Sequence, residues 1–383
     1  MNRFDLLTPK TRYRLRSAIV VCLSFASAIF FSVFFAQTAP ANTATDIATG
    51  ATAGITGLNV FGDSLVDAGN IFNLTGFPPS PPYAQQLSNG PVWPEQLADK
   101  LGVNPVLSTE ALPTLNNGAT SLPAEGINFA LAGSLTSRLN SASADLPGLQ
   151  QQVADFVALA RLAAPDPNAL YVLLAGGNDY NSAVANPAAV ATLATLPNQV
   201  TDNLIDAASA LIDAGARRLL VSNLPDLGGQ PFADFLNLAN PQSAARLSKL
   251  SSEHNLLLSQ KLASLEAASG ADIIQLDLAK LFVETITNPE SFGFTNVNTA
   301  CLTNAQAESG LQRICNNPDE FLFWDDRHPT AAGHRAIAQL AFSNLVQPDP
   351  KVSSTNVPVP IGFLGIASSV GIAAIAFYKR YSS

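Results

Sequence analysis

Most of the chain alternates between short, mostly apolar runs and longer stretches in which apolar residues recur at helical spacing. The short runs predict buried strands at 57–63, 127–132, 170–175, 218–222 and 271–278. Helical spacing predicts helices at 93–101, 147–164, 198–214, 241–269 and 331–346. Two further segments, 74–91 and 104–125, are predicted to be loops.

Apolar strands that take turns with helices are typical of a parallel sheet covered by helices on both faces. We therefore expect an α/β protein with a three-layer α/β/α sandwich, in one domain over residues 57–347. A linker at 348–360 is expected to follow it. Ligands of such sheets bind at the carboxyl ends of the strands, so chemistry is expected where strands end.

The two longest apolar runs lie at the ends of the chain, beside clustered basic residues. Residues 1–41 carry five basic side chains and one acidic one, and the apolar run after Arg16 continues to Ala36. Ala39-Pro40-Ala41 then offers the small residues of a signal-peptidase site. This predicts a secretory signal over 1–41, with an uncleaved N-terminal anchor as the alternative. Residues 42–56 are expected to be a flexible leader.

Residues 361–383 form a second candidate membrane segment. Its apolar part, 361–378, is barely long enough to span a bilayer as a helix, and basic residues follow. With the Pro-containing stretch before it, this end resembles the PEP-CTERM sorting tails of Gram-negative bacteria, although Val359 stands where those tails usually have Glu. The resemblance implies a sorting enzyme as a partner; the alternative is a plain hydrophobic anchor. Both place 42–356 outside the cytoplasm: in the periplasm, at the cell surface or in the medium.

Composition and cysteine usage narrow the class of protein. Of all residues, 47% are hydrophobic and 13% charged, and the net charge is −9. These values disfavour a disordered chain, a coiled coil and a nucleic-acid binder. Cys301 and Cys315, in an exported domain, are expected to form a disulfide, the alternative being two free thiols. Two cysteines and scattered histidines do not predict a metal site.

Histidine is scarce, which limits the candidates for a catalytic base to His254, His328 and His334. An acid three residues before His328, Asp325, can turn back and bind one ring nitrogen, leaving the other nitrogen to take a proton. Asp326 is the alternative partner. His254 is expected to be a surface or structural residue, and His334 to lie on a helix face.

Ser64 is the candidate nucleophile. It follows the first predicted strand, where a helix is expected to begin, so that its hydroxyl faces the cleft and its backbone N–H can bind an oxyanion. A lone serine at such a position is more often a helix cap. Gly133 and Asn178 follow two other strands and are candidates for further oxyanion donors, although each also fits a simple turn.

Together these blocks resemble the SGNH/GDSL hydrolase family. Residues 61–70 match F-G-D-S-L-x-D-x-G-N, Asn128 and Gly133 match the second block, 176–179 match G-x-N-D, and 325–328 match D-x-x-H. Segments 88–93 and 223–228 are similar to the lipase-like branch of the family. The resemblance covers about residues 57–340, in the order of the family's blocks.

The resemblance implies a flavodoxin-like SGNH hydrolase fold and a role for each site residue. Ser64 would be the nucleophile, His328 the base and Asp325 its orienting acid, with Ser64, Gly133 and Asn178 forming an oxyanion hole. The implied activity is hydrolysis of carboxylic esters, of the esterase or lipase type, through an acyl-enzyme and without a metal or cofactor. Small-molecule, lipid or acyl-sugar esters are the implied substrates. Two other functions stay open: polysaccharide O-deacetylation, and a non-catalytic surface binding module on the same fold.

Overall fold

The computed structural model describes residues 54–116, 121–186, 188, 192–303 and 313–346. They belong to one compact unit, Thr45–Ser383, and the other unit, Met1–Ala44, contains none of them. The predicted signal, linker and C-terminal hydrophobic segment, with most of the leader, therefore lie outside the described residues. Within the described ranges, no helix is both long enough and apolar enough to cross a membrane.

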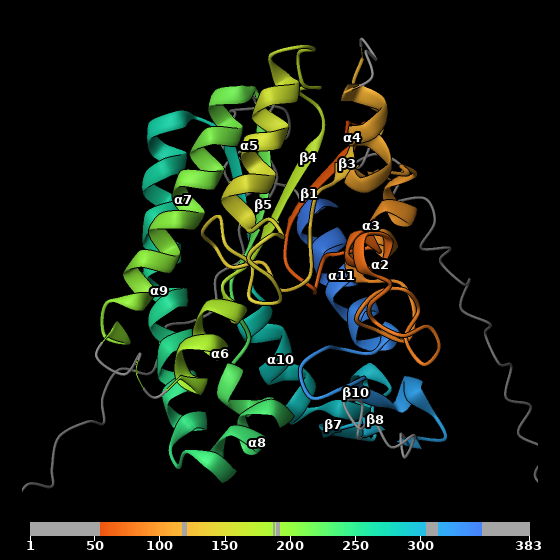
Figure 1. The fold of residues 1–383 in the computed structure, drawn as a ribbon, viewed down its shortest axis with the longest axis vertical. Coiled ribbons are helices and arrows are strands. Elements are labelled where there is room, and N and C mark those ends of the chain that lie inside the picture. Colours follow the sequence, from red (N-terminus) through yellow and green to blue (C-terminus); the bar gives the residue numbers. More distant parts are fainter. Residues whose placement is uncertain (1–53, 117–120, 187, 189–191, 304–312, 347–383) are drawn as a thin grey trace, which may run out of the picture. The chain divides into compact units, whose positions relative to one another are not determined.

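Parallel strands form a central six-stranded sheet in the order β2-β3-β1-β4-β5-β6 (Figure 1). The strands are β1 (Leu58–Gly62), β2 (Val106–Leu107), β3 (Ile127–Asn128), β4 (Leu170–Leu174), β5 (Arg218–Ser222) and β6 (Asp272–Leu276). β1 and β4 are buried along their whole length, as their unbroken apolar pattern requires. The prediction of a parallel α/β sheet is confirmed.

Helices surround this sheet and the loops at its carboxyl edge. The α-helices of the described residues are α2 (Asn70–Thr75), α3 (Trp93–Leu101), α4 (Ser108–Asn116), α5 (Leu149–Ala160), α6 (Gly177–Ala185), α7 (Leu196–Ala214), α8 (Pro231–Ala239), α9 (Ser243–Ser269), α10 (Leu278–Thr287) and α11 (Ala331–Val346). The longest, α9, is followed by the capping residue Gly270, whose left-handed φ of 70° favours glycine.

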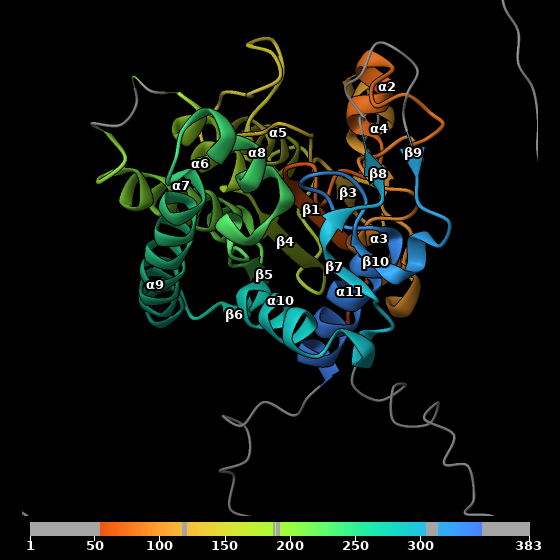
Figure 2. The ribbon, with the colours of Figure 1, turned by 90° about the horizontal axis from the view of Figure 1, so that it is seen from below.

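The side chains of β4 show how the sheet makes two cores. Leu170, Val172 and Leu174 pack with α3, α10 and α11 on one face. Tyr171 and Leu173, on the other face, pack with α4, α5, α7 and α9. Figure 2 shows the two groups of helices on either side of the strands. The expected three-layer α/β/α arrangement follows from this alternation.

One predicted loop, 104–125, is partly helical, so that prediction is wrong. It contains β2, which pairs with β3, and then α4, which has Pro113 inside it. Proline removes a helical hydrogen bond and normally indicates a break. Ala111 and Leu115 of α4 are nevertheless buried in the second core, and this packing outweighs the local preference.

Short strands and 3₁₀ turns occupy the chain between α10 and α11. β7 (Asn296–Ala300) pairs with β10 (Phe321–Phe323), and β8 (Leu302–Thr303) pairs with β9 (Arg313–Ile314). The 3₁₀ turns are η2 (Leu227–Gly229), earlier in the chain, and η3 (Pro289–Phe292) and η4 (Pro318–Glu320). The predicted disulfide between Cys301 and Cys315 is present, and it joins the residue just before β8 to the residue just after β9.

Candidate active site

β1 delivers Ser64 to the carboxyl edge of the sheet. At Gly62, the last residue of β1, φ is +150° and a Cβ would lie 2.0 Å from the carbonyl oxygen of Leu174. Only glycine lets the chain pass this close to β4. The close passage brings the residues after β1 beside those after β4.

A single tight turn then holds Ser64. The N–H groups of Val66 and Asp67 donate to the carbonyl oxygen of Asp63 over 3.1 and 3.0 Å. The prediction that a helix begins at this serine is wrong, because α2 begins only at Asn70. Ser64 is 8% exposed in this turn and is therefore a buried residue.

A chain of hydrogen bonds links Ser64 to the loop after β10. The hydroxyl oxygen of Ser64 lies 2.9 Å from Nε2 of His328. On the other side of the ring, Nδ1 of His328 lies 2.8 Å from each carboxylate oxygen of Asp325. Ser64 and His328 are 264 positions apart, and the fold brings the three residues together in the order the sequence predicts.

Asp325 is ionised in this arrangement. Burial alone raises the pKa of its carboxyl group, but His328 and the backbone N–H groups of Arg327 and His328 outweigh burial and lower the pKa to about 2. A charged carboxylate at Nδ1 favours the tautomer with hydrogen on Nδ1, which leaves Nε2 free to accept a proton from Ser64. The alternative acid, Asp326, instead forms an ion pair with Arg327, at 3.3 Å.

The three groups predicted to bind an oxyanion follow β1, β3 and β4. Nδ2 of Asn178 donates one hydrogen to the carbonyl oxygen of Ser134 over 3.1 Å, and the amide carries a second hydrogen. Gly133 has a φ of +81°, and a Cβ there would come within 2.5 Å of Oδ1 of Asn140. Among the hydrogen bonds of the described residues, none uses the N–H of Ser64 or Gly133 as donor.

Comparison with known proteins decides the family. The model of the GDSL-like lipase/acylhydrolase family matches residues 58–341. The chain belongs to this family.

Several known proteins are similar to this chain over about three quarters of its length. The chain is 33% identical over 313 residues to an uncharacterized protein in the trpE-trpG intergenic region of Pseudomonas putida; the match covers 76% of this chain and 49% of that protein, so the chain spans about half of that relative. It is 27% identical over 325 residues to the phosphatidylcholine-sterol acyltransferase of Aeromonas hydrophila, covering 74% and 88% of the two chains. A solved lipolytic G-D-S-L family protein from Veillonella parvula DSM 2008 is 14% identical, covers 75% and 96%, and has a TM-score of 0.36.

Two residues of the first GDSL block tie the strand ends together. The side chain of Asn70 donates to the carbonyl oxygens of Asn128 and Ala130 over 2.8 and 3.0 Å. Asp67 accepts from the N–H of Ala132 over 2.9 Å and from three N–H groups at the start of α2. The block therefore contains Ser64 and also the side chains that hydrogen-bond the turn of Ser64 to the loop after β3.

Gln152 is a residue of this GDSL site that the sequence analysis missed. Its Oε1 accepts from the N–H of Gly62 over 2.8 Å, and its Nε2 donates to the carbonyl oxygen of Gly62 and to Oγ of Ser134 over 2.9 and 2.8 Å. It thus connects α5, the end of β1 and the loop that carries Gly133. The available signal is a polar residue on the buried face of the predicted 147–164 helix.

Other ionisable groups are buried but lie outside the chain of hydrogen bonds from Ser64 to Asp325. Burial raises the pKa of Asp63 to about 7 and that of Asp179 to about 6. Burial lowers the pKa of both His254 and His334 to about 3. His254 contacts the hydroxyl of Tyr180 at 2.9 Å, so it is a structural residue and not a surface one.

In the ranges that the structure describes, no group of three or more His, Cys, Asp and Glu side chains is arranged to hold a metal ion.

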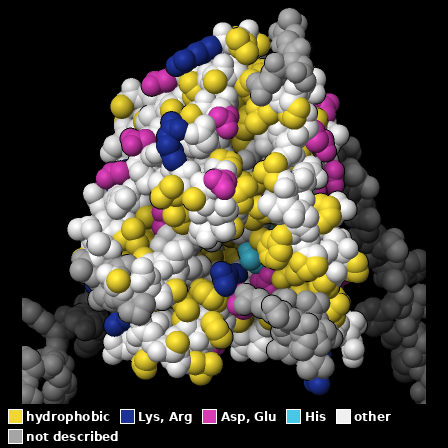
Figure 3. Space-filling view, in the orientation of Figure 1, with side chains coloured by type: hydrophobic (Ala, Val, Ile, Leu, Met, Phe, Trp, Pro, Cys, Tyr) yellow, Lys and Arg dark blue, Asp and Glu magenta, His cyan; other side chains and the backbone are white. Residues whose placement is uncertain are grey.

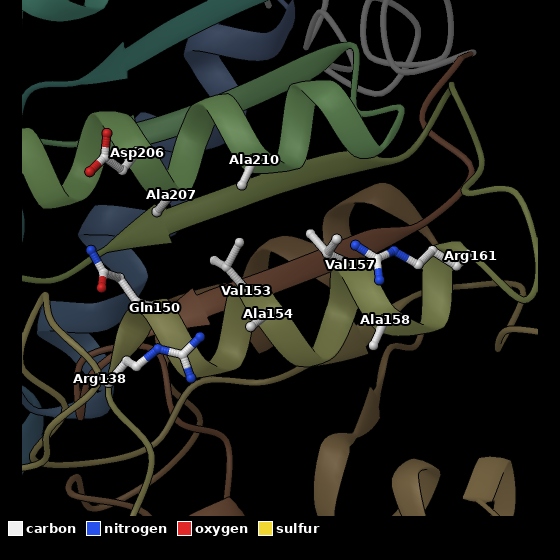
Figure 4. Close-up of a pocket in the computed structure, with 10 residues that line it drawn as sticks. All are labelled: Arg138, Gln150, Val153, Ala154, Val157, Ala158, Arg161, Asp206, Ala207 and Ala210. Atoms are coloured by element: carbon white, nitrogen blue, oxygen red, sulfur yellow. The ribbon is translucent and has the colours of Figure 1, made fainter.

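The surface of the described residues is hollowed at more than one place. In Figure 3, histidine surface appears in a hollow beside a basic group and hydrophobic side chains. A cavity of about 470 Å³ lies elsewhere, between α5 and α7, with Arg138 and Arg161 at its two ends (Figure 4). None of the residues that line it takes part in the hydrogen bonds around Ser64, so we assign the candidate site to the strand ends.

Proposed function

We propose that the protein is a serine ester hydrolase of the esterase or lipase type, with Ser64, His328 and Asp325 as its triad. The observation that carries the proposal is the continuous chain of hydrogen bonds from the Ser64 hydroxyl to the Asp325 carboxylate, in a chain of the GDSL family. An imidazole between a hydroxyl and a buried carboxylate is the arrangement that turns serine into a nucleophile.

In the first half of the reaction, Nε2 of His328 takes the proton of the Ser64 hydroxyl while Oγ bonds to the ester carbonyl carbon. The carbonyl oxygen becomes an oxyanion, which accepts hydrogen bonds from the N–H groups of Ser64 and Gly133 and from the Asn178 amide. Asp325 stabilises the imidazolium formed meanwhile. The tetrahedral intermediate then breaks its bond to the alkoxy oxygen, which leaves as an alcohol with the proton from His328.

In the second half, water gives a proton to His328 and bonds to the acyl carbon. A second oxyanion forms in the same place and collapses, and the bond to Oγ of Ser64 breaks. His328 returns the proton to Ser64, and a carboxylic acid leaves. The proposal requires no metal and no organic cofactor, because protein groups supply the nucleophile, the base and the oxyanion donors.

We further propose that residues 57–347 act outside the cytoplasm. The basic and apolar pattern of residues 1–41 supports export, and the hydrophobic segment 361–383 supports attachment to a membrane or processing by a sorting enzyme. The disulfide between Cys301 and Cys315 agrees with an oxidising compartment.

A panel of p-nitrophenyl esters from acetate to palmitate tests the proposed activity. Wild-type turnover that Ser64→Ala abolishes, in a variant with an unchanged thermal midpoint, is the expected result. Turnover that persists in Ser64→Ala contradicts the acyl-enzyme mechanism. The chain-length profile separates an esterase from a lipase, and activity on acetylated sugar alone identifies a polysaccharide deacetylase.

A wild type that is folded but inactive on every ester calls for one further measurement. A fluorophosphonate probe labels an activated serine covalently whether or not the right substrate is present. Labelling of Ser64 supports an ester hydrolase of unknown substrate, and no labelling supports the non-catalytic binding module.

A further inference from the structure

Residues 83–90, here called the strap, lie against the loop that carries the acid and the base. Near the end of the strap, Oγ of Ser88 donates to the carbonyl oxygen of Pro329 over 2.9 Å. Oδ1 of Asn89 accepts from the N–H of Ala331 over 2.8 Å and caps the start of α11. At Gly90, a Cβ would come within 3.0 Å of the Cβ of Ala331. The 88–93 block, to which the sequence analysis assigned no role, thus holds the backbone just after His328.

The beginning of the strap reaches the catalytic acid itself. The hydroxyl of Tyr83 lies 2.9 Å from Oδ2 of Asp325, across 242 positions of sequence. The Tyr83 ring is 7% exposed and meets the Trp324 ring edge-on, with 6.2 Å between centroids. Burial and the neighbouring Asp325 both raise the pKa of Tyr83 above its usual range. The Tyr83 hydroxyl therefore stays protonated and donates a hydrogen bond to the Asp325 carboxylate.

This bond completes the coordination of Asp325. A carboxylate has about four sites for hydrogen-bond donors. Oδ1 accepts from the backbone N–H groups of Arg327 and His328 over 3.0 and 2.8 Å, and Nδ1 of His328 lies 2.8 Å from both oxygens. Tyr83 is the fourth donor, and among the bonds of the described residues it is the one that comes from outside the loop of Asp325.

We propose that Tyr83 is a positioning residue of the acid–base pair: its hydroxyl fixes the Asp325 carboxylate against His328 and moderates how strongly that carboxylate holds a proton on the imidazole. The inference rests on the proposed function, in which His328 must be neutral to accept the serine proton. Without the hydrogen bond from Tyr83, the negative charge of the carboxylate is less stabilised, so the carboxylate attracts the hydrogen on Nδ1 more strongly. The imidazolium becomes more stable, and Nε2 stays protonated up to a higher pH.

Several other groups act on the charge of His328, and the test keeps them constant. They are Asp325 and Asp326 on its own loop, Asp63 on the turn after β1, and His334 on α11, and Arg327 is paired with Asp326. Tyr83→Phe removes one oxygen atom and leaves all of these side chains in place. Tyr171→Phe is the matched control: Tyr171 lies near the start of β4, and among the hydrogen bonds of the described residues its hydroxyl makes the one to the carbonyl oxygen of Asp166, at 3.4 Å.

The first measurement is kcat/KM against pH on a p-nitrophenyl ester, with full-length wild type, Tyr83→Phe and Tyr171→Phe. We expect Tyr83→Phe to move the midpoint of the acid limb upward by about 0.5–1 pH unit, a fraction of the strength of a hydrogen bond to a charged group. Tyr171→Phe should leave the midpoint in place. A Tyr83→Phe enzyme with an unmoved midpoint overturns the inference, even if its rate falls equally at all pH values, since a purely structural role has that effect.

A second variant covers the case in which Tyr83→Phe folds poorly. Site-specific 3-fluorotyrosine at position 83 keeps the ring and makes the hydroxyl a stronger donor, so the midpoint should move downward instead. An upward or absent shift contradicts the proposal.

A readout without substrate separates this inference from the proposed function. The chain has three histidines, two of them buried, so the titration of the His328 ring is readily followed by NMR, with His328→Gln to assign its signal. The expected upward shift in Tyr83→Phe supports the role of Tyr83 whether or not an ester is found. An unshifted His328 in an enzyme that Ser64→Ala inactivates overturns the role of Tyr83 alone.

Discussion

The pKa values of two buried aspartates near Ser64 are shifted in opposite directions, and their surroundings explain why. For Asp325, burial raises the pKa, but the imidazole of His328 and the backbone N–H groups of Arg327 and His328 outweigh burial and lower the pKa to about 2. Asp63 has comparable burial but accepts only the N–H of Leu65, at 3.0 Å, among the described side-chain bonds, and its pKa rises to about 7. Asp67 accepts four N–H groups and its pKa still rises to about 6, so it is the imidazole of His328, 2.8 Å from both oxygens of Asp325, that sets Asp325 apart.

Asp63→Asn should change how stability depends on pH. The pKa of Asp63 is higher in the folded protein than in the unfolded chain, so between about pH 4 and 7 the folded state binds more protons and stability falls as pH rises. Asparagine removes this loss. We therefore expect the thermal midpoint of Asp63→Asn, relative to wild type, to be higher at pH 8 than at pH 5. The buried histidines affect the stability of both proteins equally, so their opposite pH dependence cancels in the comparison of variant with wild type. A difference in thermal midpoint between the two proteins that does not vary with pH contradicts the raised pKa of Asp63.

At the scale of elements, the sequence predicts those strands and residue pairs that depend on residues close together in the chain. β1, β4 and β5 are found where continuous apolar runs predict them, and the pairing of Asp325 with His328 follows from a spacing of three residues. α4 was missed because Pro113 disfavours a helix locally, while contacts with the distant core stabilise it. Tyr83 and Gln152 were missed for the same reason. Their partners lie 242 and 90 positions away, and nothing in their own neighbourhood indicates those partners.

Gln152→Leu tests the connection between α5 and the end of β1. The substitution keeps a large side chain but removes the acceptor of the buried Gly62 N–H, whereas the carbonyl oxygen of Gly62 keeps the N–H of Leu131, at 3.0 Å. Such a loss costs about 1–3 kcal/mol in the free energy of unfolding. Urea denaturation should show this decrease, together with slower ester turnover. Gln151→Leu on the same helix is the control. Among the bonds of the described residues, the Gln151 amide is paired with Asp155 and Arg138 nearer the surface, so its loss should change the free energy far less; equal losses in both variants contradict the role of Gln152.

At the scale of the whole described unit, the site depends on segments that meet only in the folded sheet. The turn with the proposed nucleophile follows β1, the candidate oxyanion donors follow β3 and β4, and the proposed acid and base follow β10. β10 is not part of the main sheet, so other contacts must hold its loop. Cys301 and Leu302 supply two of them, donating their N–H groups to the carbonyl oxygens of Phe323 and Trp324 over 3.0 and 2.6 Å. The disulfide at Cys301 therefore anchors the chain that supports the loop of Asp325.

Removing this disulfide should affect both stability and catalysis. It spans 14 positions, and closing a loop of about this length stabilises a folded chain by about 3 kcal/mol. We expect Cys301→Ser/Cys315→Ser to lower the thermal midpoint by several degrees, and dithiothreitol to do the same to wild type. Because Cys301 and Leu302 also bond the backbone before Asp325, kcat should fall at temperatures where the variant is still folded, and dithiothreitol should not slow the variant further. A lower midpoint with an unchanged kcat would limit the disulfide to stability and leave Tyr83 and the strap as the supports of the acid.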